Sequence, residues 1–224
     1  MKNKFMKRAF LSNIKNWKLI LILILLNILV LFLTNEFVIT KEVYFNSYFE
    51  QLGTDVLEDF FGVLEIRQWI SLAIIPFYVL IKSYLVYFCL SIGLFFYDDN
   101  DPQNIYKKLF KLVLIAEFIP LLSKCYKFLY FFVLKEEYLI QDFQFYTPLS
   151  YTNFLDLKRI DPWLIYPLQT INLFEIAYFF ILTYGLHKLS QNKYSKDFEI
   201  VAVSYGAGLI IWLGLIMFLT LNIS

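Results

Sequence analysis

The chain alternates long apolar segments with shorter polar ones. Five of the apolar segments approach the roughly 20 residues that a helix needs to cross a bilayer core. They lie at positions 17–33, 69–96, 109–134, 163–186 and 200–221. The pattern predicts an all-α fold, a polytopic membrane helical bundle of five transmembrane helices that forms a single domain over residues 1–224.

The segments between the predicted spans carry patterns of their own. Over 45–66, apolar residues recur every three or four positions with acidic residues between them, which predicts one or two amphipathic helices. These helices either pack on the outer ends of the spans or lie on the outer membrane surface, where they would meet lipid or a partner. Residues 136–160 are rich in aromatic side chains, and we expect them to fold over the same outer face.

The Lys and Arg residues predict the orientation. Residues 1–18 hold six Lys or Arg and no acid. Segment 97–108 ends in Lys107 and Lys108, with Lys111 just beyond, and 187–198 holds Lys188, Lys193 and Lys196. Segment 34–68 holds two Lys or Arg against seven acids, and 135–162 holds three against five. Because Lys and Arg concentrate in cytoplasmic loops, we expect the N-terminus in the cytoplasm and the C-terminus outside. The first span follows a basic stretch and lacks a small-residue cleavage site, so we interpret it as an uncleaved signal anchor.

Composition agrees with a membrane protein and narrows the expected partners. The chain is 59% hydrophobic and 21% aromatic, which is more apolar than a soluble domain of this length. A net charge of +1 argues against nucleic-acid binding, so we expect membrane lipids and protein partners, or a homo-oligomer, instead. The abundance of Lys, Asn, Ile, Phe and Tyr is typical of AT-rich bacterial genomes, which favours the cytoplasmic (inner) membrane.

Four charged residues lie in the interior of the predicted spans, whereas Lys127 lies closer to the outer end of the third span and could extend its ammonium to the surface. With Asn172 the four form the candidate intramembrane polar network, which consists of Lys82, Glu117, Lys124, Asn172 and Glu175. An unpaired charge at mid-membrane costs at least roughly 2.5–3.5 kcal/mol, so pairing or neutralisation is expected. Lys82 and Glu175 lie at similar depth, and we expect them to pair. Glu117 and Lys124 share a helix face about 10 Å apart, so each is expected to meet a neighbouring helix.

Two interpretations of this network stay open. It is either a buried set of contacts that fixes the register of the helices, or a polar cavity that serves as an ion or proton path or a lipid-headgroup site. A contact with another subunit is a third reading.

Further residues predict helix boundaries and close packing. Pro120 removes a backbone hydrogen bond and predicts a kink in the third span. Asp161 and Pro162 predict a capped helix start. The small-xxx-small pairs at Ala202/Gly206 and Ser204/Gly208 allow close helix packing or dimerisation.

Sequence motifs of common catalytic sites are missing. There is no HExxH, GxSxG, P-loop or GxGxxG motif. The single histidine, His187, falls at the end of the fourth predicted span, where a helix C-terminus favours a cation. We therefore expect no enzymatic activity, no metal site and no cofactor.

The closing part of the chain shows a family resemblance. TPLSYTNFLDL (147–157) leads into INLFEIAYFFILTYGLHKLSQ (171–191), and the basic stretch NKYSKDFEIV then precedes a last apolar span. This arrangement resembles the Yip1 family of small multi-spanning membrane proteins, most strongly over residues 147–221. The resemblance implies five spans and a short extracytoplasmic tail, and no catalytic residues. The eukaryotic relatives have a longer cytoplasmic region for small-GTPase and trafficking partners, and those partners do not carry over to this chain.

These patterns together predict a function class. We expect a non-enzymatic, Yip1-like protein that organises protein partners or lipids within a membrane complex. The alternative is a transporter or channel subunit with a polar cavity around Lys82, Glu117, Lys124 and Glu175. Side chains that line a water-accessible path would favour transport, and a dry, paired network would favour the organising role.

Overall fold

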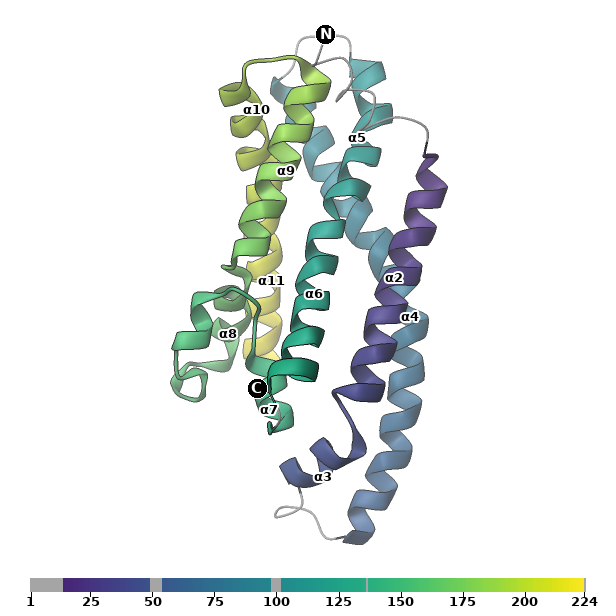
Figure 1. The fold of residues 1–224 in the computed structure, drawn as a ribbon. Helices are drawn as coiled ribbons and strands as arrows, with labels where there is room; N and C mark the ends of the chain where they lie inside the picture. Colours follow the sequence, from purple (N-terminus) through teal and green to yellow (C-terminus); the bar gives the residue numbers. More distant parts are fainter. Residues whose placement is uncertain (1–13, 49–53, 98–101, 136, 224) are drawn as a thin grey trace.

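Helices make up the whole regular structure of the part of the chain that the computed structural model describes, residues 14–48, 54–97, 102–135 and 137–223 (Figure 1). The α-helices are α2 (Asn16–Phe37), α3 (Lys41–Tyr48), α4 (Thr54–Tyr97), α5 (Pro102–Ala116), α6 (Phe118–Leu129), α7 (Ile140–Phe145), α8 (Pro162–Thr170), α9 (Leu173–Ser190), α10 (Tyr194–Val201) and α11 (Ala207–Ile223). Four short helical segments complete the series. They are the π-helices η1 (Tyr130–Leu134) and η4 (Ala202–Gly206) and the 3-10 helices η2 (Tyr151–Phe154) and η3 (Leu157–Arg159). The basic stretch 1–13, on which the expected orientation partly rests, lies outside the described residues.

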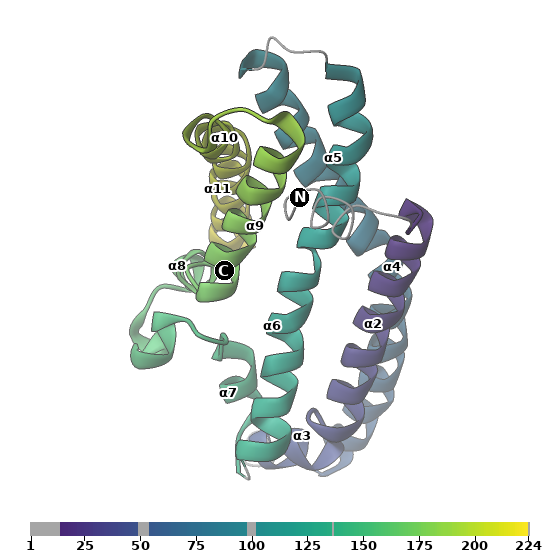
Figure 2. The same ribbon diagram turned by 45° about the horizontal axis from the view of Figure 1, so that its top comes forward.

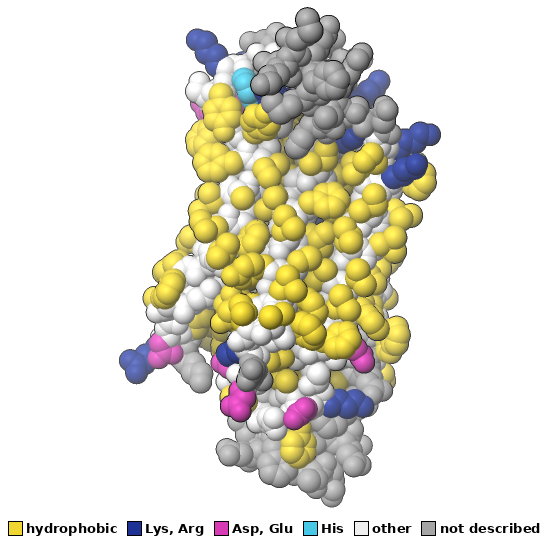
Figure 3. Space-filling view, viewed as in Figure 1, with side chains coloured by type: hydrophobic (Ala, Val, Ile, Leu, Met, Phe, Trp, Pro, Cys, Tyr) yellow, Lys and Arg dark blue, Asp and Glu magenta, His cyan; other side chains and the backbone are white. Residues whose placement is uncertain are grey.

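Among the described residues, three helices are long and apolar enough to cross a membrane. They are α2, the part of α4 from Gly62 to Phe96, and the continuous run of α10, η4 and α11 from Tyr194 to Asn222. On the face that Figure 3 shows, apolar side chains cover the middle of the molecule and charged side chains gather toward its two ends. The other two predicted spans differ, because the third is interrupted at Glu117 and the fourth is split into α8 and α9.

The second predicted span belongs to a much longer helix. α4 has 44 residues, which is about 66 Å at 1.5 Å per residue and about twice the thickness of a bilayer core. In Figure 1 it runs the length of the molecule behind α2. The expected amphipathic helices over 45–66 are therefore only partly correct. α3 is a separate short helix, but the chain from Thr54 onward continues unbroken into the span instead of lying across its end.

The fourth predicted span, 163–186, is wrong as one helix. α8 begins at Pro162 as expected, although the Asp161 side chain forms no capping hydrogen bond, and it ends at Thr170. A new helix, α9, starts after Asn172. The Asn172 side chain caps α9 by accepting a hydrogen bond from the Glu175 backbone N–H at 2.9 Å. The preceding loop holds this break open, since the Leu173 N–H donates to the Leu149 carbonyl.

Residues 137–160 fold over the ends of the long helices, as expected from their aromatic content. The Tyr138 hydroxyl donates to the Val38 carbonyl at 2.7 Å, and the Ile140 N–H donates to Ser47 Oγ at 2.9 Å. Tyr146 stacks on Tyr130 with the ring centroids 4.3 Å apart. Burial, together with neighbouring tyrosines, raises the pKa of Tyr146 to about 12, so this hydroxyl stays neutral in the packed loop.

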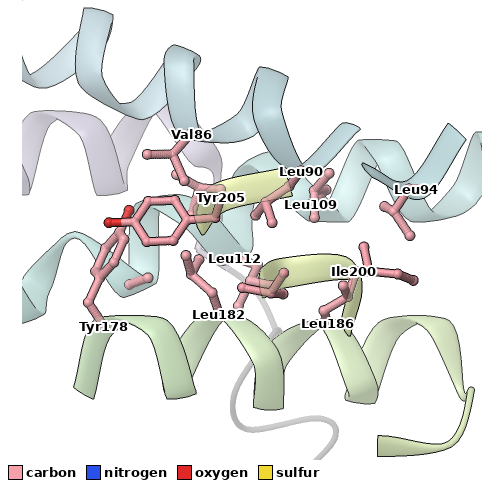
Figure 4. Close-up of a cluster of buried hydrophobic side chains, with 13 residues drawn as sticks. Val86, Leu90, Leu94, Leu109, Leu112, Tyr178, Leu182, Leu186, Ile200 and Tyr205 are labelled. Atoms are coloured by element: carbon pink, nitrogen blue, oxygen red, sulfur yellow. The ribbon is translucent and has the colours of Figure 1, made fainter. Parts of the chain in front are cut away.

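The main core joins α4, α5, α9 and α10–η4 (Figure 4). Close helix approaches shape it. A Cβ at Gly185 would overlap Leu112, and one at Gly93 would come within 2.6 Å of Ser204. Ser204 and Gly208 thus face α4, which assigns that small-residue pair to packing inside the chain.

Candidate functional site

Four charged residues of the predicted spans, Lys82, Glu117, Lys124 and Glu175, gather near the middle of the bundle. We call the set of contacting residues the polar layer; its members are Asn27, Tyr78, Lys82, Glu117, Lys124, Glu175, Tyr178 and Tyr205. They come from α2, α4, α5–α6, α9 and η4, so the layer connects helices that are far apart in the sequence.

Glu117 is the centre of the polar layer. It occupies the break between α5 and α6, visible in Figure 2 as the junction of the two helices. The break lies three residues before Pro120, which cannot donate a backbone hydrogen bond to the preceding turn and for this reason was expected to permit a kink. The break places Glu117, which is only 8% exposed, between α4 and α9.

Both carboxylate oxygens of Glu117 have partners. Lys82 Nζ lies 2.9 Å from Oε2 and forms a salt bridge, and the Tyr178 hydroxyl donates to Oε1 at 2.8 Å. Lys82 Nζ also lies 5.2 Å from the centre of the Tyr178 ring. The expected Lys82–Glu175 pair is therefore wrong, because Glu117 supplies the carboxylate. A buried carboxylate with charge-assisted hydrogen bonds on both oxygens is far less costly than an unpaired one.

Glu175 lies in the same region but has a different partner. It belongs to the first turn of α9, where a negative charge interacts favourably with the helix dipole. Its Oε1 accepts a hydrogen bond from the Tyr205 hydroxyl of η4. In Figure 4 the hydroxyls of Tyr178 and Tyr205 lie close together at one end of the aliphatic cluster. The two tyrosines thus link the apolar core to the two glutamates.

Lys124 forms the opposite edge of the polar layer. Its Nζ donates to Asn27 Oδ1 at 2.8 Å and lies 5.2 Å from the centre of the Tyr78 ring. The Asn27 Nδ2 group in turn donates to the Leu23 carbonyl, which fixes the amide with its oxygen toward Lys124. The expectation that Glu117 and Lys124 each meet a neighbouring helix is confirmed.

A small cavity lies between α2, α4 and α6 at the level of these contacts. Its volume is about 10 Å³, room for about one water molecule. It is lined by Leu23, Asn27, Tyr78, Val79, Lys82, Glu117, Pro120, Leu121 and Lys124. Polar groups on three helices therefore face one water-sized space.

Asn172 does not join the polar layer. Its side chain accepts from the Glu175 N–H and donates to the Gln169 carbonyl, so it shapes the start of α9. The sequence analysis missed Asn27, Tyr78, Tyr178 and Tyr205. Asn27 could have been predicted, because it is the one polar residue in the apolar segment 19–33. The three tyrosines could not, because nothing in the sequence distinguishes them from the other tyrosines among the 17 in the chain.

A second polar cluster closes the turn between α9 and α10. Asp197 is fully buried, accepts a hydrogen bond from Ser190 Oγ at 2.8 Å and lies 3.3 Å from His187 Nδ1. His187 is thus more than a boundary residue, because it contacts a buried carboxylate that joins the two helices.

Comparisons of the sequence with known family models and curated proteins, and of the fold with solved structures, find no match.

Proposed function

We propose that this chain is a non-enzymatic, five-span protein of the bacterial cytoplasmic membrane that organises protein partners or lipids within a membrane complex. In this proposal α5–α6 and α9 cross the membrane beside the three long apolar helices. The Yip1-like character of the closing segments, residues 147–221, is part of the same proposal.

The paired state of Glu117 carries the proposal. Both of its oxygens bind groups on other helices, and the salt bridge to Lys82 neutralises its charge inside the bundle. The cavity beside it has room for about one water molecule. A layer with these properties holds the helices in one arrangement. This is expected of a protein that binds partners or lipids through its outer faces and loops.

Charge asymmetry between the two ends of the bundle supports the proposed orientation. One end, where α4 leads into α5 and α9 into α10, carries Lys107, Lys108 and Lys111 on α5 and Lys188, Lys193 and Lys196 around the α9–α10 turn. The other end carries segments 34–68 and 135–162, in which acids outnumber Lys and Arg. The positive-inside rule then favours a cytoplasmic location for the Lys-rich end.

The second candidate is a transporter or channel subunit. The observation that favours it is the cavity that Lys82, Glu117 and Lys124 line together. Transport would require this cavity to widen and to connect with both sides of the membrane, because its present volume admits about one water molecule.

One pair of measurements separates the two candidates. The protein is extracted from its native membrane in polymer-bounded discs, and the mass of the particle is compared with the 26.8 kDa of the chain. The organising role predicts a defined excess mass from a stoichiometric partner or bound lipid. Purified protein in vesicles should then dissipate proton and potassium gradients no faster than empty vesicles. An unaccompanied chain that conducts, and that loses conduction in Glu117→Gln, would support transport instead.

A further inference from the structure

Lys124 differs from the other charges of the polar layer because it is exposed at the surface of the bundle. Within the described residues its polar contacts are the Asn27 amide oxygen and the face of the Tyr78 ring, and neither carries a charge. If α2 and α6 cross the bilayer, this side chain lies at the hydrocarbon-facing surface of the bundle, and no carboxylate of the described part of the chain lies at hydrogen-bond distance from its ammonium. Ionisable residues in that situation are expected to pair, so the position calls for an anion from outside the chain.

The depth of Lys124 excludes a lipid phosphate as that anion. Asn27 lies midway along the 22 residues of α2, so Lys124 Nζ is about 15 Å from either end of that helix. Lipid phosphates lie beyond the hydrocarbon core, whose half-thickness is about 15 Å. The ammonium also turns inward to Asn27 rather than along the helix toward either surface.

A second copy of this chain is a poor source of the anion as well. The carboxylates at this level are Glu117 and Glu175, and both accept hydrogen bonds inside their own bundle. A copy that offered either one would have to give up contacts with Lys82, Tyr178 or Tyr205.

The surface next to Lys124 suits a helix. Ile74, Tyr78, Ile81 and Leu85 are all at least half exposed and recur every three or four residues, so they form one ridge along α4. Tyr78 belongs both to this ridge and to the lining of the cavity. Ridges of this kind pack against the grooves of a neighbouring helix.

We propose that Lys124 is the docking point for a transmembrane helix of a partner protein that carries an aspartate or glutamate at mid-membrane. The partner carboxylate binds the Lys124 ammonium at the rim of the cavity, and its helix packs along the α4 ridge. The inference rests on the proposed function, since it specifies the chemistry of a partner that the chain organises.

The test uses synthetic single-span helices as defined probes. A leucine-rich peptide with one central Glu is compared with a peptide that has Gln at the same position and with one in which the Glu is moved two turns toward an end. Binding to the full-length protein is measured by fluorescence transfer in vesicles of neutral phosphatidylcholine. We expect the central-Glu peptide to bind at least about tenfold more tightly than either control.

Two variants assign the preference to Lys124. Lys124→Met should remove the preference for Glu, whereas the matched variant Lys127→Met, one turn away on α6, should keep it. To separate loss of binding from loss of folding, Lys124→Glu is also tested with a central-Lys peptide, and the preference should then follow the swapped charges.

Four results would overturn the inference. The first is equal binding of the Glu and Gln peptides to the wild-type protein. The second is a preference for Glu that persists in Lys124→Met. The third is a preference that disappears when anionic phosphatidylglycerol is added, because the lipid would then be the occupant. The fourth is Lys124-dependent self-association without peptide binding, which would make a second copy the occupant. If the Lys124→Met protein still extracts from its native membrane with excess mass, the inference fails but the proposed function stands. If even the wild-type protein extracts without excess mass, the proposed function fails too.

Discussion

Replacing Lys82 or Glu117 tests the pairing on which the polar layer depends. Removing one partner of a buried ion pair leaves the other charge uncompensated, at about 3–5 kcal/mol. The Lys82 side chain is 29% exposed, and polar groups of the unfolded chain also find partners within the membrane or micelle. We therefore expect Lys82→Met and Glu117→Leu each to lower the free energy of unfolding by about 2–3 kcal/mol. The double variant removes both charges together and should lose about the same amount as one single variant. The coupling free energy is then about 2 kcal/mol.

The assay is reversible unfolding in mixed detergent micelles, followed by circular dichroism for the wild type, both single variants and the double variant. A second cycle with Lys82→Met and Glu175→Leu is the control, because Glu175 bonds to Tyr205 rather than to Lys82. We expect that cycle to show coupling of less than about 0.5 kcal/mol. Additive losses in the Lys82–Glu117 cycle, or stronger coupling of Lys82 to Glu175, would refute the assigned pairing.

Four further substitutions, one of them a matched control, test other parts of the account by thermal unfolding in detergent. Asp197→Asn weakens the acceptor that joins α9 to α10 and should destabilise the protein by about 1–3 kcal/mol; an unchanged melting temperature would argue against this cluster. Tyr205→Phe leaves Glu175 without its hydroxyl donor and should destabilise the protein by a similar amount; an unchanged melting temperature would show that this hydrogen bond does not contribute to stability. Gly185→Ala pushes a methyl group into the core and should cost about 1–3 kcal/mol, whereas Gly214→Ala, with open space around it, should be neutral or slightly stabilising; equal effects at the two glycines would contradict the packing.

The sequence was sufficient to predict an all-helical chain with apolar spans, because long apolar runs leave few other folds. The limits of the fourth span were wrong for a local reason. Asn172 can either lie on the polar side of a continuing helix or cap a new one, and an apolar pattern alone does not distinguish these roles. The contacts of residues 149–150 with 171–173 decide it, and they join segments that sequence periodicity treats separately.

Four of the eight residues of the polar layer were predicted from the sequence, but their pairs were not. Lys82, Glu117, Lys124 and Glu175 do lie in one region, as their depth in the spans indicated. Depth alone favoured Glu175 as the partner of Lys82, because helix periodicity gives the direction of a side chain only relative to its own helix. The break before Pro120, which turns Glu117 between α4 and α9, decides the pairing in favour of Glu117.

The location of the polar layer at mid-membrane depends on whether α5–α6 and α9 cross the bilayer, and labelling at Phe154 tests this most directly. Phe154 is 91% exposed in the loop between these segments. Single cysteines replace Lys15, Phe154 or Asn222 in a background with Cys89 and Cys125 changed to alanine, and intact cells are treated with a membrane-impermeant maleimide. Five spans predict that positions 154 and 222 react while position 15 is protected. Protection of position 154 together with position 15, with only position 222 reacting, would contradict the account, because only the three long apolar helices would then cross.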